Sequence, residues 1–238
     1  GIGGIGISSL GVIDHEKGCY LGGVQNLPAL LGLNLKETLA DRYPGLPIVI
    51  LNDAKAAALG ELWVGEGRDC SSLFCITLGT GIGGALVVNG KLVHGFHNRA
   101  GEVGYSDYQS ESDFAELHFS TEAVMAKMSR KIQEPMDGYK FFEKCYNEEP
   151  EYLAELEVWM RGVARLIANL CLLIDPQKVL IGGGISSEYE ILIPMLTRYT
   201  DEMLPIEFHG QTVIAPAGNS YNAGILGAVA GLVLEGSR

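Results

Sequence analysis

Three glycines in the first half of the chain have a spacing that is common in loops that bind phosphate groups. In the stretch TLGTGIGGALVVNGKLVHG, residues 77–95, the residues Gly79, Gly81 and Gly84 form the pattern G-x-G-x-x-G. A dinucleotide-binding turn of this pattern is followed by a helix, whose N-terminus faces the pyrophosphate. Here two short β runs follow, joined by Asn89-Gly90, which is a strong hairpin signal. The dinucleotide interpretation is therefore rejected, and a Walker A loop is excluded because no Gly-Lys-Ser/Thr occurs.

Two interpretations of the glycine stretch remain. One is a phosphate loop on a β-hairpin, since glycine lets backbone N–H groups approach an anion and Thr77 and Thr80 add hydroxyl donors. No lysine lies between Thr77 and Gly84, so backbone dipoles and a divalent cation would have to hold the anion. The other is a tight turn that needs glycine for steric reasons alone. The motif by itself does not decide between them.

A second candidate for chemistry is the pair Asn52-Asp53, which ends the apolar run PIVILND at 47–53. This run predicts a buried strand with an exposed tip, and the helix-forming residues 54–65 follow at once. Open α/β folds carry their chemistry at such strand ends. A carboxylate there could act as a general base, but an Asn-Asp pair in this position is also a common helix N-cap.

The elements that would position these residues alternate between strand and helix, which predicts an α/β fold. Asn34 and Glu37 form a capping box that opens a helix over 34–43, and the composition changes at 65–70, the expected linker. Strands are expected at 47–53, 71–79 and 212–216, a strand running into a turn at 5–14, two short β runs at 85–93, and a strand with a glycine loop at 178–186. Further helices are expected at 54–65, 120–132, 151–174, from 186 to about 200, and 222–236.

Composition excludes several classes of partner. The 238 residues carry a net charge of −12 with no Lys/Arg cluster, so nucleic acid is a poor partner. The apolar runs are too short to cross a membrane, and no signal peptide opens the chain. The five cysteines are scattered with no C-x-x-C, which predicts reduced thiols in a cytoplasm and indicates no metal site.

Four segments in order along the chain resemble the ROK family of sugar kinases and sugar-responsive repressors. They are LNDAKAAALGE at 51–61, the glycine stretch at 77–95, GEVGY at 101–105 and IGGGIS at 181–186. The resemblance implies an actin-like, hexokinase-like (ribonuclease H-like) pair of α/β lobes. One lobe would comprise residues 1–68 and the last helix, 222–238, and the larger lobe residues 69–221.

The resemblance also implies roles for particular residues. Asp53 matches the family's catalytic base, which accepts the proton of the sugar hydroxyl as the hydroxyl attacks the γ-phosphate. The implied substrate-binding residues are Asn26, Asn52, Asp53, Glu102, Tyr105 and Glu116, and the implied ATP-binding residues are Thr77, Gly79, Thr80, Gly81, Gly183 and Gly184. Taken without the resemblance, Glu102 and Glu116 would be read as solvated surface charges.

The chain departs from the family pattern in informative ways. Tyr105 replaces a histidine that contacts sugar and, in many members, zinc, and residues 105–119 contain no cysteine. We therefore predict no zinc site. Zinc-free branches of the family include kinases of β-glucosides, which moves the expected substrate away from N-acetylated aminosugars. Tyr105 could contact the sugar or simply pack. Lys55 stands where the family often has asparagine.

The expected activity is phosphorylation of a hexose or β-glucoside hydroxyl by Mg-ATP, in a cytoplasmic homodimer. Strict dependence on Mg²⁺ is expected, because an acidic protein needs the cation to screen the triphosphate. The alternative is the sugar-binding sensor domain of a ROK repressor. The family's opening Asp-x-Gly-Gly-Thr strand, which binds nucleotide phosphates, does not precede Gly1, so the chain is either a fragment or lacks that motif.

Overall fold

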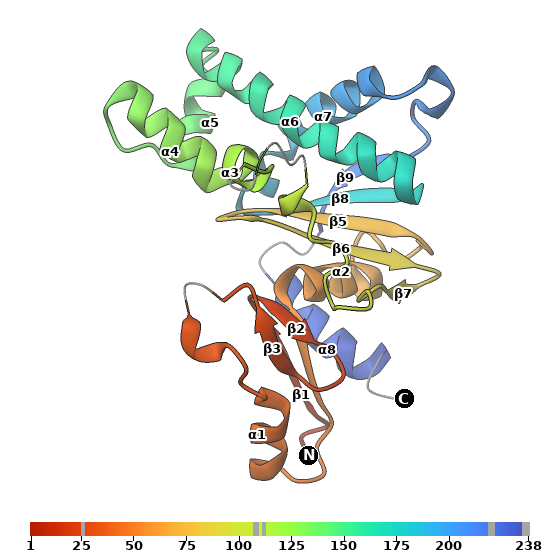
Figure 1. The fold of residues 1–238 in the computed structure, drawn as a ribbon. Helices are drawn as coiled ribbons and strands as arrows, with labels where there is room; N and C mark the ends of the chain where they lie inside the picture. The colour runs from red at the N-terminus through yellow and green to blue at the C-terminus, as the bar shows by residue number, and fades with distance from the viewer. Residues whose placement is uncertain (25–26, 107–109, 111–112, 219–221, 235–238) are drawn as a thin grey trace. The chain divides into compact units, whose positions relative to one another are not determined.

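The computed structural model describes residues 1–24, 27–106, 110, 113–218 and 222–234. Its strands and helices alternate along the chain and group into two compact units (Figure 1). The first unit comprises Gly1–Cys75, Ala85–Gly101 and Ala217–Arg238, and the second comprises Ile76–Gly84 and Glu102–Pro216. The lobe boundaries expected from the sequence remain a prediction.

The first unit contains a parallel strand pair and a hairpin. Strand β1 (Ile5–Ser9) pairs with β4 (Ile48–Asn52) in register from Ile5↔Ile48 to Ser9↔Asn52. Strands β2 (Val12–Asp14) and β3 (Cys19–Gly22) pair antiparallel. The short 3₁₀ helix η1 (Pro28–Leu30) follows β3. The parallel pairing places the end of β4, Asn52, beside the end of β1.

Three helices pack on these strands. Helix α1 (Leu35–Arg42) begins with the predicted capping box, in which Asn34 Oδ1 accepts from the backbone N–H of Glu37 at 3.0 Å. Helix α2 (Asp53–Val64) follows β4 directly and packs against α8 (Ala223–Leu234). The two helices approach closely because Gly227 lies on the backbone of Ala56, where any β-carbon would overlap the chain.

A five-stranded sheet has the order β7-β6-β5-β8-β9. Its strands are β5 (Leu73–Leu78), β6 (Ile82–Val88), β7 (Lys91–Leu92), β8 (Lys178–Gly183) and β9 (Val213–Pro216). The predicted hairpin is confirmed: β6 and β7 pair antiparallel across Asn89 and Gly90, which have φ values of 53° and 69°. Both turn residues thus adopt the left-handed conformation that a two-residue hairpin requires.

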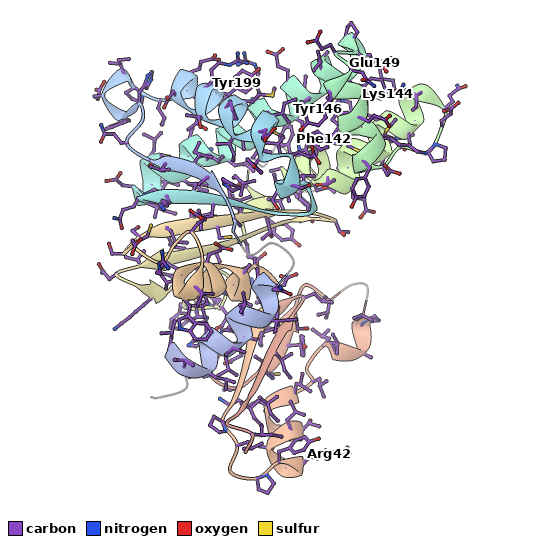
Figure 2. All side chains as sticks on the ribbon, turned by 180° about the vertical axis from the view of Figure 1, so that it is seen from behind. Arg42, Phe142, Lys144, Tyr146, Glu149 and Tyr199 are labelled. Carbon is purple, nitrogen blue, oxygen red and sulfur yellow. The ribbon has the colours of Figure 1, made fainter. Side chains whose placement is uncertain are left out.

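The second unit carries most of the helices. They are the 3₁₀ helices η2 (Val103–Tyr105), η3 (Gly184–Glu188) and η4 (Ile206–Phe208), and the α-helices α3 (Glu116–Phe119), α4 (Thr121–Ile132), α5 (Gly138–Tyr146), α6 (Pro150–Ile174) and α7 (Tyr189–Met203). Helix α6 confirms the long helix predicted from the sequence. Figure 2 shows Lys144 and Glu149, whose charged atoms are 2.9 Å apart, at the junction of α5 and α6.

The core of the second unit is aromatic. Trp159 is fully buried with Phe141 and Phe142 around it, and its indole N–H donates to the carbonyl of Phe119 at 2.8 Å. This bond satisfies the polar edge of a buried ring, and it fixes the residues just before α4. Within the described part of the chain, no helix has the length and apolar character that crossing a membrane requires.

Candidate active site

Asn52 and Asp53 lie where the sequence predicts them, at the junction of β4 and α2. Asn52 is the N-cap of α2: its Oδ1 accepts from the N–H groups of Ala54 (3.0 Å) and Lys55 (3.2 Å). Its Nδ2 donates to the carbonyl of Gly11 at 3.1 Å. Both ends of this amide are therefore engaged, and they fix the turn from which Asp53 projects.

Asp53 is the first residue of α2, and its Oδ1 accepts from the N–H of Ala54 at 2.8 Å. Although the residue has an exposed surface, the surrounding protein desolvates its carboxyl group, and this raises the pKa of Asp53 above its ordinary value. Hydrogen bonds from the backbone and from Asn52 oppose the rise. A carboxylate with a raised pKa at a helix start suits a general base.

A second group of predicted residues gathers within the second unit. Glu116 begins α3, and its Oε2 accepts from the backbone N–H of Ile82 at 2.8 Å. Its carboxylate lies against Gly81 and, at 3.2 Å from an ideal β-carbon position, against Gly104. Glu116 is therefore no simple surface charge, because it connects the start of α3 to the glycine stretch before β6.

Tyr105 lies beside the same carboxylate. Burial raises the pKa of its hydroxyl first, and the negative charges of Glu116 and Glu102 raise it further. Its ring is 5.0 Å from that of Phe114, and 51% of the residue remains exposed. Two carboxylates and a phenol thus share one region, with acceptors and a donor that hydroxyl groups can use.

The glycines of the two predicted nucleotide loops divide into two kinds. Gly183 has φ 95°, and its missing β-carbon would overlap the backbone of Leu78, so this position is restricted to glycine by packing. At Gly81 a β-carbon would meet only the end of the Glu116 side chain, which can shift. Gly79 and Gly184 have no heavy atom within 4 Å of an ideal β-carbon and no positive φ. Packing does not account for these two glycines, since a β-carbon would have space at either position.

The threonines of the glycine stretch differ in exposure. Thr80 is exposed and Thr77, on β5, is partly buried. The Gly79 N–H donates to Gly81 O at 3.0 Å, and the Gly79 carbonyl accepts from the N–H of Glu122 in the first turn of α4 at 3.3 Å. Asn26, the remaining predicted sugar ligand, lies outside the described residues.

Sequence reasoning missed a cluster around Asn98. Lys55 Nζ donates to the Asn98 carbonyl at 2.8 Å, and Asn98 Oδ1 contacts both the backbone N and the ring Nδ1 of His15. In the sequence, the only indication of this cluster was the lysine at position 55 in place of the asparagine that the family often has, and it did not indicate Asn98 as the partner. Among the residues described, no group of three His, Cys, Asp or Glu side chains could hold a metal ion. Nucleotide-bound Mg²⁺ needs no such group, since it binds mainly through phosphates and water.

The chain belongs to the ROK family, whose model matches residues 1–235. A β-glucoside kinase of Listeria innocua is 31% identical over 245 residues, which cover 99% of this chain and 81% of the relative. A ROK family protein of Streptococcus pneumoniae, solved in complex with sucrose, matches with a TM-score of 0.88 at 26% identity, and the match covers 100% of this chain and 83% of that protein's chain. A Streptomyces griseus ROK glucokinase, solved with glucose and AMPPNP, has a TM-score of 0.81 at 25% identity, with coverage of 96% and 80%.

These matches confirm the predicted family and the predicted α/β fold class, that of the actin-like and hexokinase-like proteins. Two of the three are kinases by name, which is the enzyme class expected from the sequence. The matched structures hold a sugar, or a sugar together with a nucleotide analogue.

Proposed function

We propose that this chain is an ATP-dependent sugar kinase that phosphorylates a hydroxyl of a hexose or β-glucoside. The observation that carries the proposal is the arrangement around Glu116. Its carboxylate accepts a hydrogen bond from the N–H of Ile82, in the glycine stretch, and Tyr105 lies close enough to be affected by the charges of both Glu116 and Glu102. Groups suited to hydroxyls and backbone suited to phosphate thus adjoin within one unit.

The proposed reaction forms one bond and breaks one. The sugar hydroxyl oxygen attacks the γ-phosphorus, the bond from that phosphorus to the bridging oxygen of ADP breaks, and the hydroxyl proton passes to Asp53. Little covalent assistance is needed in such a transfer beyond positioning and charge neutralisation. Mg²⁺, held by the phosphates, would neutralise the charge that develops on their oxygens.

The remaining proposed residues bind either the sugar or the nucleotide. Glu102 and Glu116 would accept hydrogen bonds from sugar hydroxyls, and Tyr105 would contact the sugar with its exposed edge, with Asn52 and Asn26 as further sugar contacts. The proposed phosphate contacts are Thr77, Gly79, Thr80 and Gly81, and the proposed adenosine contacts are Gly183 and Gly184. The free space beside Gly79 and Gly184, which packing leaves unfilled, supports both placements.

Glucose and β-glucosides are the sugars we propose. The replacement of histidine by Tyr105 and the similarity to a β-glucoside kinase support this choice. The strong negative charge of the chain supports strict dependence on Mg²⁺. The proposal extends to a cytoplasmic homodimer, as the family resemblance implies.

The test is ADP release from Mg-ATP across a sugar panel, on the protein with its natural N-terminus. The panel contains glucose, fructose, mannose, N-acetylglucosamine and the β-glucoside cellobiose, and Asp53→Asn is the matched control. We expect release with glucose or cellobiose, and a loss of about 10²- to 10⁴-fold in the control. Excess chelator should abolish the activity.

Two outcomes would contradict the proposal. Sugar binding without ADP release from any member of the panel would favour the sensor domain of a ROK repressor instead. Undiminished turnover in Asp53→Asn would remove Asp53 from the role of base while leaving the kinase assignment in place.

A further inference from the structure

A cavity of about 680 Å³ lies within the first unit, and its lining includes none of the residues that the proposed kinase reaction uses. It adjoins Ile48 and Val49 at the start of β4, whereas Asn52 and Asp53 stand at the other end of that strand. Sites for small organic molecules have volumes of about 300–1,000 Å³. The cavity is therefore large enough for such a molecule.

Much of the lining is apolar and belongs to the core of the unit. Ile48 and Leu51 reach the cavity from β4, Leu59 reaches it from α2, and Leu92 reaches it from β7. All four residues are buried. Apolar surface of this kind favours the hydrocarbon or aromatic part of a ligand.

Two ammonium groups also belong to the lining. Lys36 is in the first turn of α1, and its Nζ donates to the backbone carbonyl of Glu16 at 2.9 Å, which uses one of its three donors. Lys91 is an exposed residue of β7, and in the described part of the chain its ammonium makes no hydrogen bond or ion pair. Glu16 is the only acidic residue among the lining residues described. The lining thus carries more positive than negative charge in a chain whose net charge is −12.

A pair of histidines completes the polar part of the lining. The rings of His15 and His94 stack with centroids 3.8 Å apart and planes 9° apart. His15 Nδ1 lies 2.6 Å from Asn98 Oδ1, which also accepts from the backbone N–H of His15 at 3.2 Å. The pair is therefore a fixed, planar part of the lining, and a planar ring is the ligand group that packs best on such a surface.

We infer that this cavity is a second binding site, for a small organic anion with a carboxylate, phosphate or sulfonate group on an apolar, aromatic body. The anionic group binds the ammonium groups of Lys36 and Lys91, and the body lies on the apolar lining. These lysines are needed because the net charge of the chain repels anions. All the lining residues belong to the first unit, so the site depends neither on kinase activity nor on the second unit.

The probe is 8-anilinonaphthalene-1-sulfonate, an aromatic anion whose fluorescence increases in apolar surroundings. It is titrated into the protein in the absence of sugar and ATP, and the dissociation constant is taken from the fluorescence. N-phenyl-1-naphthylamine has the same rings without the sulfonate, so it is the matched neutral probe. A change that affects the first probe and not the second reports the contribution of charge.

Two sets of variants test the site. The first is the double variant Lys36→Met with Lys91→Met, which removes both ammonium groups. Its control is Lys140→Met, because Lys140 on α5 is exposed and has no side-chain partner within the described ranges, but does not line the cavity. The second is Ala40→Glu, which adds a negative charge at an exposed lining position of α1, with Ala40→Gln as the uncharged control of equal size.

We expect the anionic probe to bind at least about 5-fold more weakly to the double lysine variant and to Ala40→Glu, as the loss of exposed charge pairs predicts. Both control variants should stay within about 2-fold of the wild type, and the neutral probe should bind all variants within about 2-fold of the wild type. If the double variant fails to fold, the comparison of Ala40→Glu with Ala40→Gln decides by the same criteria.

Three results would overturn the inference: no saturable binding of the anionic probe to the wild type, unchanged affinity in Ala40→Glu and the double variant, or equal weakening of the two probes. The last result would show that the variants alter packing rather than an anion site. Absence of ADP release in the sugar panel would overturn the proposed function and leave this inference standing, because neither probe titration involves sugar or ATP.

Discussion

Replacing Asn52 by alanine should loosen the start of α2 and alter the proposed base together. The amide caps the helix through two bonds, to the N–H groups of Ala54 and Lys55, and donates a third to Gly11 O. Loss of such a cap costs about 1 kcal/mol and loss of the further hydrogen bond about 0.5–1.5 kcal/mol. Together they predict a loss of about 1.5–2.5 kcal/mol, which is about a 10- to 70-fold change in the equilibrium for opening.

The measurement is native-state hydrogen exchange of the α2 amides at pH 7, which reports local opening without requiring the two units to unfold together. Asn52→Asp is the matched control, because its carboxylate keeps the cap and loses only the donor to Gly11. We expect that variant to cost only the lost hydrogen bond, about 0.5–1.5 kcal/mol. The reasoning would be refuted if the α2 amides were equally protected from exchange in the alanine and aspartate variants. It would also be refuted if their exchange rates in the alanine variant stayed within about 2-fold of the wild type.

The same variant changes the titration of Asp53. The hydrogen bond from Asn52 lowers the pKa of that carboxyl against the larger effect of burial, so its removal raises the pKa further. A base with a higher pKa needs a higher pH to lose its proton. The acidic limb of kcat/KM should therefore move to higher pH in Asn52→Ala, and a shift in the opposite direction would contradict this assignment.

Three further outcomes follow from single residues. Asp53→Asn should be at least as stable as the wild type at pH 7, because burial raises the folded-state pKa of Asp53 and its ionisation at higher pH therefore weakens folding. In thermal melts the melting temperature of the variant should exceed that of the wild type by an amount that shrinks as the pH falls toward 4, and a lower melting temperature at pH 7 would contradict the prediction. In urea unfolding, Gly183→Ala should lose at least about 2 kcal/mol of the free energy of unfolding, because its β-carbon overlaps the backbone. Gly184→Ala should stay within about 0.5 kcal/mol of the wild type and raise the KM for ATP, and equal losses in the two variants would refute the distinction. Burial, with a smaller contribution from a nearby glutamate, raises the pKa of the Cys75 thiol from 9.0 to about 12, so its thiolate fraction at pH 8 is about 1,000-fold lower than that of a free thiol. Thiol titration should therefore leave Cys75 unreacted in the folded protein, and the free energy of unfolding should fall above pH 9, because the thiol of the unfolded chain ionises first.

Much of the local structure could be predicted because its causes are local. Asn89-Gly90 predicts a hairpin turn since both residues accept a positive φ, and the turn is there. Asn34 predicts the start of α1 because its side chain caps residues only three positions away. Asn52 was placed correctly at a strand end for the same reason. In each case the interacting groups are a few residues apart, so the sequence contains the whole interaction.

By itself the sequence also determined the family, because four ordered motifs are more specific than any one of them. It determined the candidate base at Asp53 and the candidate glycine loops. It did not determine which glycines are restricted by packing, because the backbone of Leu78 lies against Gly183 only after β5 and β8 come together in one sheet.

The tertiary structure alone decided how the candidate residues are held. Glu116 bonds Ile82, 34 positions away, Lys55 bonds Asn98 across 43 positions, and His15 bonds Asn98 across 83. No periodicity or motif encodes such pairs, since each depends on the packing of elements that are distant in the chain. The sequence named the groups that could do chemistry, and folding determined which of them are anchored, desolvated or open to a ligand.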